Sequence, residues 1–412
     1  MQKSLDRKLA AIHADPAGCR EFLLADAKDA DMAFGIGAPG LSPERHDGEL
    51  RFRTLAEYRE QIRQIVRSEL VDIMLMSTST NDLLAIKERL FENSPVTPAA
   101  RANDTTDIHI LRGGRLHEPA SRPFRTAEID HIQCGHLDCA PGERRLGADL
   151  GLYSLTFNND VDLDRRTLEA FKLFREEAER KSFRYFLEVF DPNLPGAVPA
   201  EKLGEFINDA IVRALAGVAS AGRPLFLKIV YHGPRALEEL VAYDPHLVVG
   251  ILGGSAGTTR DAFQLLRDAK KYGARIALFG RKINNAESQL AFVEFLRLIA
   301  DGHLEPAEAV RAYHSVLQKL GIPARRPLER DLELTDGSMS YGGGSSTISL
   351  PGVAPKTASP ARRENQQIQR ANPPALPSEG GENAKPDFAR MSPAERLAYH
   401  RDRLNRQFGE RS

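Results

Sequence analysis

Three short apolar runs decide the fold of this chain: PLFLKIVY at 224–231, HLVVGIL at 246–252 and ARIALF at 274–279. Each run is followed by a stretch with apolar residues at helical spacing, which gives a strand-helix alternation. Strands of a parallel sheet are covered by helices on both faces, so they read as continuous apolar runs. The segment therefore predicts a parallel α/β fold, with a functional site where these strands end.

The same alternation extends through the rest of the chain. We expect five earlier strands, at 30–36, 70–76, 107–111, 148–156 and 184–190. The helical patterns lie at 54–69, 81–91, 164–181, 200–221, 287–301 and 306–320. Strands and helices in this number and order predict a (β/α)8 TIM barrel. A doubly wound open sheet is the alternative, but no G-x-G-x-x-G motif opens a helix after an early strand.

Other segments flank or interrupt the predicted barrel, which spans 29–322. Residues 1–28 are an N-terminal helical segment, and residues 112–147, rich in Gly, Pro, His and Arg, are an insertion that partly replaces the third helix. Residues 323–390 lack an apolar period and predict a disordered linker. Residues 391–410 predict a short helix, since Ser392, Pro393 and Glu395 fit its N-cap, N1 and N3 positions. This helix could dock on the barrel, on a partner subunit or on an assembly, or it could be a solvated tail.

The composition excludes several classes of partner and location. The 412 residues carry a net charge of -1, which gives no overall field for nucleic acid or an anionic membrane. No apolar run reaches the length of a membrane span, and the N-terminus lacks the apolar core of a secretory signal. Three cysteines (Cys19, Cys134 and Cys139) in so long a chain do not make a disulfide framework. We therefore expect a cytoplasmic protein.

Lys228 is the strongest single candidate for chemistry. It stands inside an apolar run, and lysine is rarely buried in a strand unless it is paired. If a lysine points into a barrel, loss of solvent favours its neutral, nucleophilic amine, which can form a Schiff base with a ketone or aldehyde. The alternative is a lysine on the outer face, or one paired with a carboxylate for structural reasons.

Two glycine-rich turns follow the last two strands. Gly253, Gly254 and Ser255 follow the first of these strands, and Gly280 and Arg281 follow the second. Such turns let backbone N–H groups approach a phosphate, and an arginine adds a bidentate cation. The alternative is that these are ordinary turn glycines beside a surface arginine. The presence of two such turns after adjacent strands favours a phosphate site.

Candidate acids and bases lie on neighbouring strands. Glu188 has the parity to point inward beside Lys228, and Asp72 in the second strand is a further candidate; either could instead be a structural partner of the lysine. His232 follows the lysine strand and Asn158 ends the fourth strand, so both side chains could face substrate at the barrel mouth.

A compact cluster of metal-binding residue types lies in the insertion. His131, Cys134, His136 and Cys139 follow the spacing H-x2-C-x-H-x2-C, with Asp138 among them. This spacing lacks the two well-separated ligand pairs of most zinc sites. We therefore expect no metal here, and interpret the segment as a polar loop over the barrel mouth.

Three stretches resemble a known family: LKIVYHG at 227–233, GILGG at 250–254 and ALFGRKI at 277–283. They are similar to the class I aldolases of the deoxyribose-phosphate aldolase and archaeal-type fructose-bisphosphate aldolase group. The resemblance implies that Lys228 forms the Schiff base and that Gly253, Gly254, Gly280 and Arg281 hold the substrate phosphate. It covers about residues 148–300; before them it is only topological, and the tail has no counterpart.

The chain also departs from this family at three positions. Phe34 stands where the end of strand one should carry an acidic residue, and Phe190 precedes DPN where a tyrosine in a Y-P-R-G-like turn is usual. Lys282 replaces the usual asparagine. The resemblance therefore does not extend to the usual proton-transfer groups, and Glu188 or Asp72 would have to replace them.

We expect a reversible carbon–carbon lyase of carbohydrate metabolism, acting on a phosphorylated sugar or a related ketone or aldehyde through Lys228, with no cofactor. One alternative is a barrel that binds a phosphorylated ligand without lyase activity and is recruited to an assembly by its C-terminal helix. A Schiff-base transaldolase or isomerase is the other. We expect a homo-oligomer, and no nucleic-acid or membrane partner.

Overall fold

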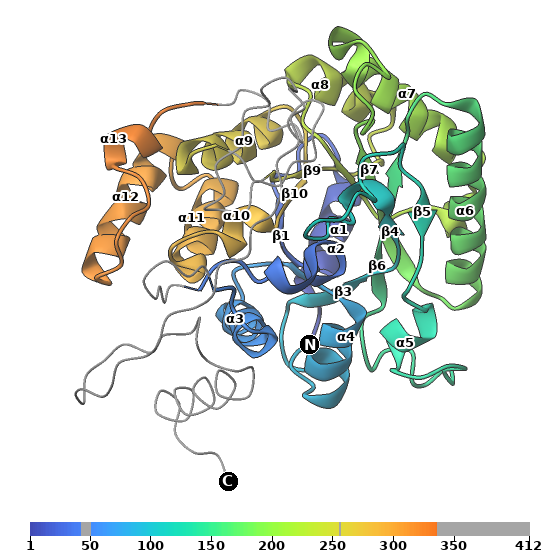
Figure 1. Cartoon of the computed structure of the whole chain (residues 1–412), viewed down its shortest axis with the longest axis horizontal. Helices are drawn as coiled ribbons and strands as arrows, with labels where there is room; N and C mark the ends of the chain where they lie inside the picture. The colour runs from blue at the N-terminus through green and yellow to red at the C-terminus, as the bar shows by residue number, and fades with distance from the viewer. Residues whose placement is uncertain (43–50, 255–256, 336–412) are drawn as a thin grey trace, which may run out of the picture. The chain divides into compact units, whose positions relative to one another are not determined.

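A closed barrel of parallel strands forms the centre of the computed structural model, which describes residues 1–42, 51–254 and 257–335 (Figure 1). The barrel strands are β1 (Leu23–Lys28), β2 (Ile73–Met76), β3 (Thr97–Arg101), β6 (Leu150–Thr156), β7 (Arg184–Phe190), β8 (Leu227–Ile229), β9 (Val249–Leu252) and β10 (Ile276–Phe279). They are hydrogen-bonded in the order β1-β10-β9-β8-β7-β6-β3-β2, and β1 pairs with β2 to close the ring. The predicted (β/α)8 barrel is confirmed.

Helices surround the strands on the outside of the barrel and cover one of its ends (Figure 1). They are α1 (Ser4–Ala14), α2 (Asp31–Phe34), α3 (Leu55–Ser68), α4 (Thr78–Asn81), α5 (Ile129–Gln133), α6 (Val161–Arg180), α7 (Leu203–Ala216), α8 (Pro234–Tyr243), α9 (Thr259–Lys271), α10 (Arg281–Asn284), α11 (Gln289–Asp301), α12 (Pro306–Lys319) and α13 (Leu328–Asp331). A π-helical turn at Asp82–Lys87 extends α4. A small antiparallel sheet, β4 (Asp104–Thr105) with β5 (Pro123–Phe124), lies between β3 and β6 in the chain.

Two predicted strands were wrong. The first strand is β1 at Leu23–Lys28, whereas the predicted strand at 30–36 forms α2 and a 3-10 turn at Gly35–Gly37. The third strand is β3 at Thr97–Arg101, and the predicted strand at 107–111 begins in a 3-10 turn, Thr106–Ile108. Both true strands are rich in alanine, which has low β propensity and so gave a weak sequence signal.

Side chains alternate between two apolar layers along each barrel strand. In β8 and the residue before it, Phe226 packs inside the barrel, while Leu227 and Ile229 pack outward against the helices. Such alternation follows from the period of two residues in a strand. Lys228, between two outward residues, therefore points into the barrel.

Helix α1 covers the N-terminal end of the barrel. Its residues Leu5, Leu9 and Ile12 join the cluster of inward-facing apolar residues from the strands. Lys8 on the same helix forms an ion pair with Asp72, the residue before β2, at 2.9 Å. The barrel interior is therefore closed at this end by apolar contact and by a buried ion pair.

The described residues beyond α12 belong to the barrel rather than to the predicted linker. Asp331, at the end of α13, is buried; it accepts a hydrogen bond from the backbone N–H of Thr259, and one carboxylate oxygen lies 2.9 Å from Nε2 of His314. Thr335 donates to the carboxylate of Asp261. Residues 331–335 thus hold the first turn of α9. The remainder of the predicted linker and the predicted helix at 391–410 lie outside the described residues.

Among residues 1–42, 51–254 and 257–335, no helix combines the length and apolar character needed to cross a membrane.

Candidate active site

A charged network fills the interior of the barrel above the apolar layer. Nζ of Lys228 lies 2.5 Å from Oε1 of Glu188, its register partner on β7. The other oxygen of Glu188 accepts a hydrogen bond from Ser154 Oγ at 2.7 Å. Arg101, at the end of β3, lies 3.4 Å from this same oxygen and 2.6 Å from Oδ2 of Asp29. Two cations and two carboxylates thus form one connected network.

Burial makes this network strongly coupled. The side chains of Arg101, Asp29, Glu188 and Lys228 are all at most 8% exposed, so each charge depends on its neighbours for stabilisation. Burial alone would lower the pKa of Arg101, but the carboxylates of Asp29 and Glu188 outweigh it and raise that pKa. Arg101 is therefore the fixed cation of the network, and proton transfer is left to its partners.

A small cavity of about 70 Å³ opens beside this network. The residues that line it come from the ends of several strands and from the turns after them: Ala27, Asp29, Ala30, Ala33, Phe34, Arg101, Ile108, Glu188, Lys228, Leu252, Gly253, Gly254, Leu278, Gly280 and Arg281. Most of the predicted site residues thus meet in one place, at the C-terminal ends of the strands. This is the end at which active sites of such barrels lie.

Both predicted phosphate turns border the cavity, and their glycines are required by close approach. A Cβ on Gly253 would lie 2.1 Å from the ring of Phe279, and a Cβ on Gly280 would lie 2.8 Å from the carbonyl oxygen of Ala27. Only glycine fits at these two positions. The guanidinium of Arg281 lies over the ring of Phe34 at 5.9 Å, so Phe34 supports the arginine.

Buried residues outside the barrel wall hold these turns in place. Lys28 on β1 points outward, is fully buried, and donates to Oδ1 of Asn284 on α10 at 2.5 Å and to Gln289 at 3.0 Å. Asp26 lies 3.1 Å from the same ammonium. Lys282 donates to the carbonyl oxygen of Gly257 at 2.8 Å and so links the turn after β10 to the turn after β9. Burial lowers the pKa of Lys282 to about 8.

Several predicted residues lie away from the cavity. Asp72 is at the N-terminal end of the barrel, where it pairs with Lys8 and with Arg297 at 3.1 Å, so the expectation that it moves protons at Lys228 is wrong on geometry. His232 is mostly buried and lies 2.9 Å from Asp191, in the turns after β8 and β7. Asn158 is buried after β6. Neither His232 nor Asn158 lines the cavity in the described part of the chain, and Ser255 lies outside that part.

Asp29 and Arg101 are the site residues that sequence reasoning missed. Both follow from the misplaced strands, because Asp29 directly follows β1 and Arg101 ends β3. The expected departure at Phe34 is therefore wrong: Asp29 is the acidic residue at the end of the first strand. The departure at Phe190 stands, since the end of β7 carries no tyrosine there. A signal was present in the sequence, because ADAK at 25–28 alternates small apolar and charged residues as a strand can.

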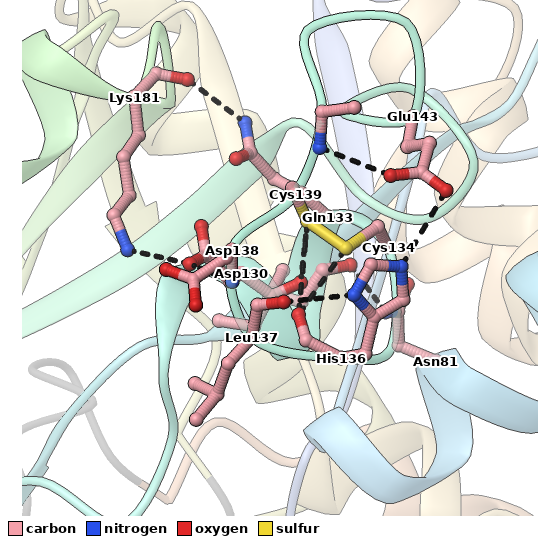
Figure 2. The surroundings of a disulfide bond; sticks show 12 residues. Asn81, Asp130, Gln133, Cys134, His136, Leu137, Asp138, Cys139, Glu143 and Lys181 are labelled. Atoms are coloured by element: carbon pink, nitrogen blue, oxygen red, sulfur yellow. Dashed lines mark hydrogen bonds and ion pairs between the residues drawn. A yellow bond between two sulfur atoms is a disulfide. The ribbon is translucent and has the colours of Figure 1, made fainter.

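The cysteine cluster lies near the N-terminal end of β6 rather than at the Lys228 cavity. It precedes β6, and Asn81 joins it to the start of that strand by bonding the carbonyl oxygen of Ile132 and the backbone N–H of Ala148. The segment is therefore not a loop over the barrel mouth. Cys134 and Cys139 form a disulfide, shown in Figure 2, although the small number of cysteines did not predict one.

Comparison with known proteins gives a match of folds. No model of a known protein family and no curated protein matches the chain. A fructose-bisphosphate aldolase from Slackia heliotrinireducens is 14% identical, with a TM-score of 0.53 over 76% of this chain and 91% of the other. An archaeal fructose-1,6-bisphosphate aldolase, solved with its catalytic lysine bound to the carbinolamine intermediate, is 16% identical, with a TM-score of 0.51 over 72% of this chain and 100% of the other. The structural neighbours of this barrel thus include class I aldolases of the archaeal type, and at these identities they establish its fold.

Proposed function

We propose that the protein is a lyase of the class I aldolase type, which makes and breaks a carbon–carbon bond through a Schiff base on Lys228. Its substrate is a phosphorylated sugar or a related ketone or aldehyde. One observation carries the proposal: the Lys228 amine is buried at a cavity that has a carboxylate on one side and two glycine turns with Arg281 on the other.

Glu188 is placed to control the proton of Lys228. Their 2.5 Å contact lets the proton pass from the ammonium to the carboxylate, which frees the amine to attack a carbonyl carbon. The carbinolamine hydroxyl then leaves as water, taking a proton from Glu188, and an iminium remains on Lys228. The proton transfer leaves the net charge of the network unchanged, because one cation and one anion are neutralised together.

Cleavage needs a base for the hydroxyl of the carbon that leaves. The iminium accepts the electron pair of the breaking bond and becomes an enamine, while the hydroxyl loses its proton and the leaving fragment becomes an aldehyde. Asp29 lines the cavity opposite the lysine strand, and Arg101 fixes it at 2.6 Å. We assign the removal of this hydroxyl proton to Asp29 or to Glu188. Either carboxylate would then replace the tyrosine that is absent from the end of β7. Protonation of the enamine and hydrolysis of the iminium then restore Lys228.

The substrate phosphate belongs at the turns after β9 and β10. Gly253, Gly254 and Gly280 offer backbone N–H groups without side chains in the way, and Arg281 adds a cation. The anion would lie at one end of the cavity and the reacting carbonyl at Lys228. Ser255 in the first turn, and Asn158 and His232 at the barrel mouth, remain candidates for further substrate contacts.

The size of the cavity favours one alternative, a barrel that binds a phosphorylated ligand without cleaving it. About 70 Å³ is small beside the roughly 300–1,000 Å³ of typical ligand pockets. Ile108, Phe190, Val230 and Leu252 form an apolar cluster at this end of the barrel. A sugar phosphate needs some of these side chains to move, and a ligand held only at the phosphate turns would not reach Lys228.

Borohydride trapping separates the two functions. The full-length protein is incubated with a panel of ketose and aldose phosphates and borohydride, and peptides are mapped by mass spectrometry. The lyase predicts an adduct on Lys228 that is lost in Lys228→Met and kept in Lys8→Met, a matched change at a buried lysine at the N-terminal end of the barrel. Ligand binding without any adduct across the panel overturns the proposal. Analysis of products then separates a lyase from a Schiff-base transaldolase or isomerase, which would also be trapped.

A further inference from the structure

The loop that carries the disulfide gathers four metal-binding side chains within ten residues. Cys134 Sγ, a ring nitrogen of His136 and a carboxylate oxygen of Glu143 lie within 4.8 Å of one another. Cys139 is joined to Cys134, so its sulfur belongs to the same group (Figure 2). Glu143 lies outside the sequence pattern of histidines and cysteines, and only the fold brings it to the cluster.

Hydrogen bonds orient two of these donors toward one point. Nδ1 of His136 lies 2.8 Å from the carbonyl oxygen of Leu137; because a carbonyl oxygen can only accept, Nδ1 carries a proton and Nε2 is the ring nitrogen left for a ligand. That Nε2 lies 3.5 Å from Oε1 of Glu143. The other oxygen of Glu143 accepts the backbone N–H of Ala140 at 3.0 Å. A histidine that donates one ring N–H to a carbonyl and aims the other nitrogen at a cluster has the arrangement of a metal ligand.

The surroundings hold the loop while leaving it accessible to an ion. Asp130 lies 2.9 Å from Nζ of Lys181 and accepts the backbone N–H of Asp138. The backbone carbonyl oxygen of Gln133 accepts a hydrogen bond from the backbone N–H of Gly147, which closes the base of the loop. The side chains of His136 and Glu143 are 55% and 40% exposed, so solvent reaches these two donors, whereas both cysteines are buried beneath them.

We propose that the disulfide is one state of a reversible site, and that the reduced loop binds one Zn²⁺ through Cys134, Cys139, His136 and Glu143. Two thiolates, one imidazole and one carboxylate give the closed, four-coordinate set of a structural zinc site. The C-x4-C spacing lies within the range of zinc-binding cysteine pairs. Thiolates favour zinc over the hard cations magnesium and calcium.

The exchange between the states is balanced by a dithiol reductant. The dithiol becomes a disulfide, and Cys134 and Cys139 become thiols by taking its two hydrogens. Zinc binding then releases both thiol protons, since the thiolate is the ligand. The metal replaces the disulfide as the cross-link of the loop, so the start of β6 stays anchored in both states. The site is separate from the Lys228 cavity and does not depend on the proposed function.

The test compares the full chain in both states, in a Cys19→Ser background that leaves two cysteines. One sample is reduced with a phosphine, which takes up oxygen from water as the disulfide gains two hydrogens, and the other stays oxidised. Both are titrated with Co²⁺ and then with Zn²⁺. The reduced protein should bind one Co²⁺ with thiolate charge-transfer and tetrahedral d–d bands, which Zn²⁺ abolishes. The oxidised protein should bind none.

Matched variants identify the ligands. His136→Ala and Glu143→Gln should weaken zinc binding by at least about tenfold, whereas His131→Ala, which changes the histidine of the same motif outside the cluster, should leave it unchanged. Circular dichroism shows that each variant is folded. The proposal is overturned if the reduced protein binds no zinc, if the oxidised protein binds it equally, or if His131→Ala and His136→Ala weaken binding to the same extent.

Discussion

Replacement of Arg101 by methionine tests whether the charged network holds the barrel interior together. Arg101 is the cation that Asp29 and Glu188 share, at 2.6 and 3.4 Å. Without it, Glu188 keeps Lys228 and Ser154, whereas Asp29 loses its ion pair inside the barrel. Removing one partner of a buried pair costs about 3–5 kcal/mol. We expect the free energy of unfolding to fall by that amount.

Urea denaturation at neutral pH measures this loss of stability. An exposed-pair variant and a double variant serve as comparisons. Arg165→Met removes an arginine of similar size from an exposed pair with Glu169, which should cost no more than about 0.5 kcal/mol. Adding Asp29→Asn to Arg101→Met removes the unpaired charge and should regain much of the loss. The reasoning is refuted if Arg101→Met costs less than about 1 kcal/mol, or if the second change deepens the loss.

The same variant should slow chemistry at the lysine. Without Arg101, Glu188 loses one of the contacts that hold its carboxylate against Lys228, so the pair is less well placed to pass the proton that frees the amine. Borohydride trapping by folded Arg101→Met should therefore be slower than in the wild type. Arg101→Lys keeps the charge but cannot present the guanidinium fork, so it should lie between the two. Trapping at the wild-type rate in Arg101→Met would show that the arginine is only structural.

Three further predictions concern other parts of the barrel. Asp72→Asn should lower the free energy of unfolding by about 3 kcal/mol, because it removes the carboxylate that pairs with buried Lys8 and with one side of Arg297. Trapping at Lys228 should not change, and a loss of trapping in the folded variant contradicts this. Gly253→Ala should cost about 1–3 kcal/mol by the clash with Phe279 and weaken binding of phosphorylated ligands in calorimetry, and wild-type affinity would argue against the phosphate turn. The pKa of Lys282 is about 8 in the folded chain, below its ordinary value of 10.5. Between these pH values the unfolded chain binds more protons at this residue than the folded chain does, so the contribution of Lys282 to the free energy of unfolding rises with pH. Denaturation of Lys282→Met across pH 8 to 10 should show that rise reduced by up to about 1.4 kcal/mol per unit, and an unchanged slope would refute the assignment.

The sequence predicts best where strands are long and apolar. The strands from β6 to β10 lie where their apolar runs predicted them, because branched and aromatic residues such as Val249 and Ile276 mark them. Strands β1 and β3 failed for a shared reason. Three of their inward positions are alanines, Ala25, Ala27 and Ala99, in the interior cluster that α1 joins. Small residues there carry little strand signal, although the packing requires them.

The candidate site was predictable where chemistry is local and hidden where it depends on charge pairing. Lys228 stands out because a lone lysine interrupts an apolar run, and its neighbour Glu188 follows from strand parity. Arg101 gives no such signal: it follows two alanines and looks like the start of a loop. Its role appears only when Asp29, seventy-two residues away, is brought to 2.6 Å. Pairing over such separations is a property of the fold.

The barrel uses buried charge in opposite ways at its two ends. At the N-terminal end, Asp72 is held between Lys8 and Arg297, beside the apolar residues of α1, and it does not line the cavity at Lys228. At the other end, Glu188 is held between Arg101 and Lys228, and the cavity opens directly onto the lysine. An ion pair enclosed by packing contributes only to the stability of the fold. In an ion pair that borders a cavity, one charged group can leave its partner and contact a bound ligand instead. Because α1 closes the N-terminal end, a substrate would approach Lys228 past the loops at the C-terminal ends of the strands. It would therefore contact the proposed phosphate turns before it reaches the amine.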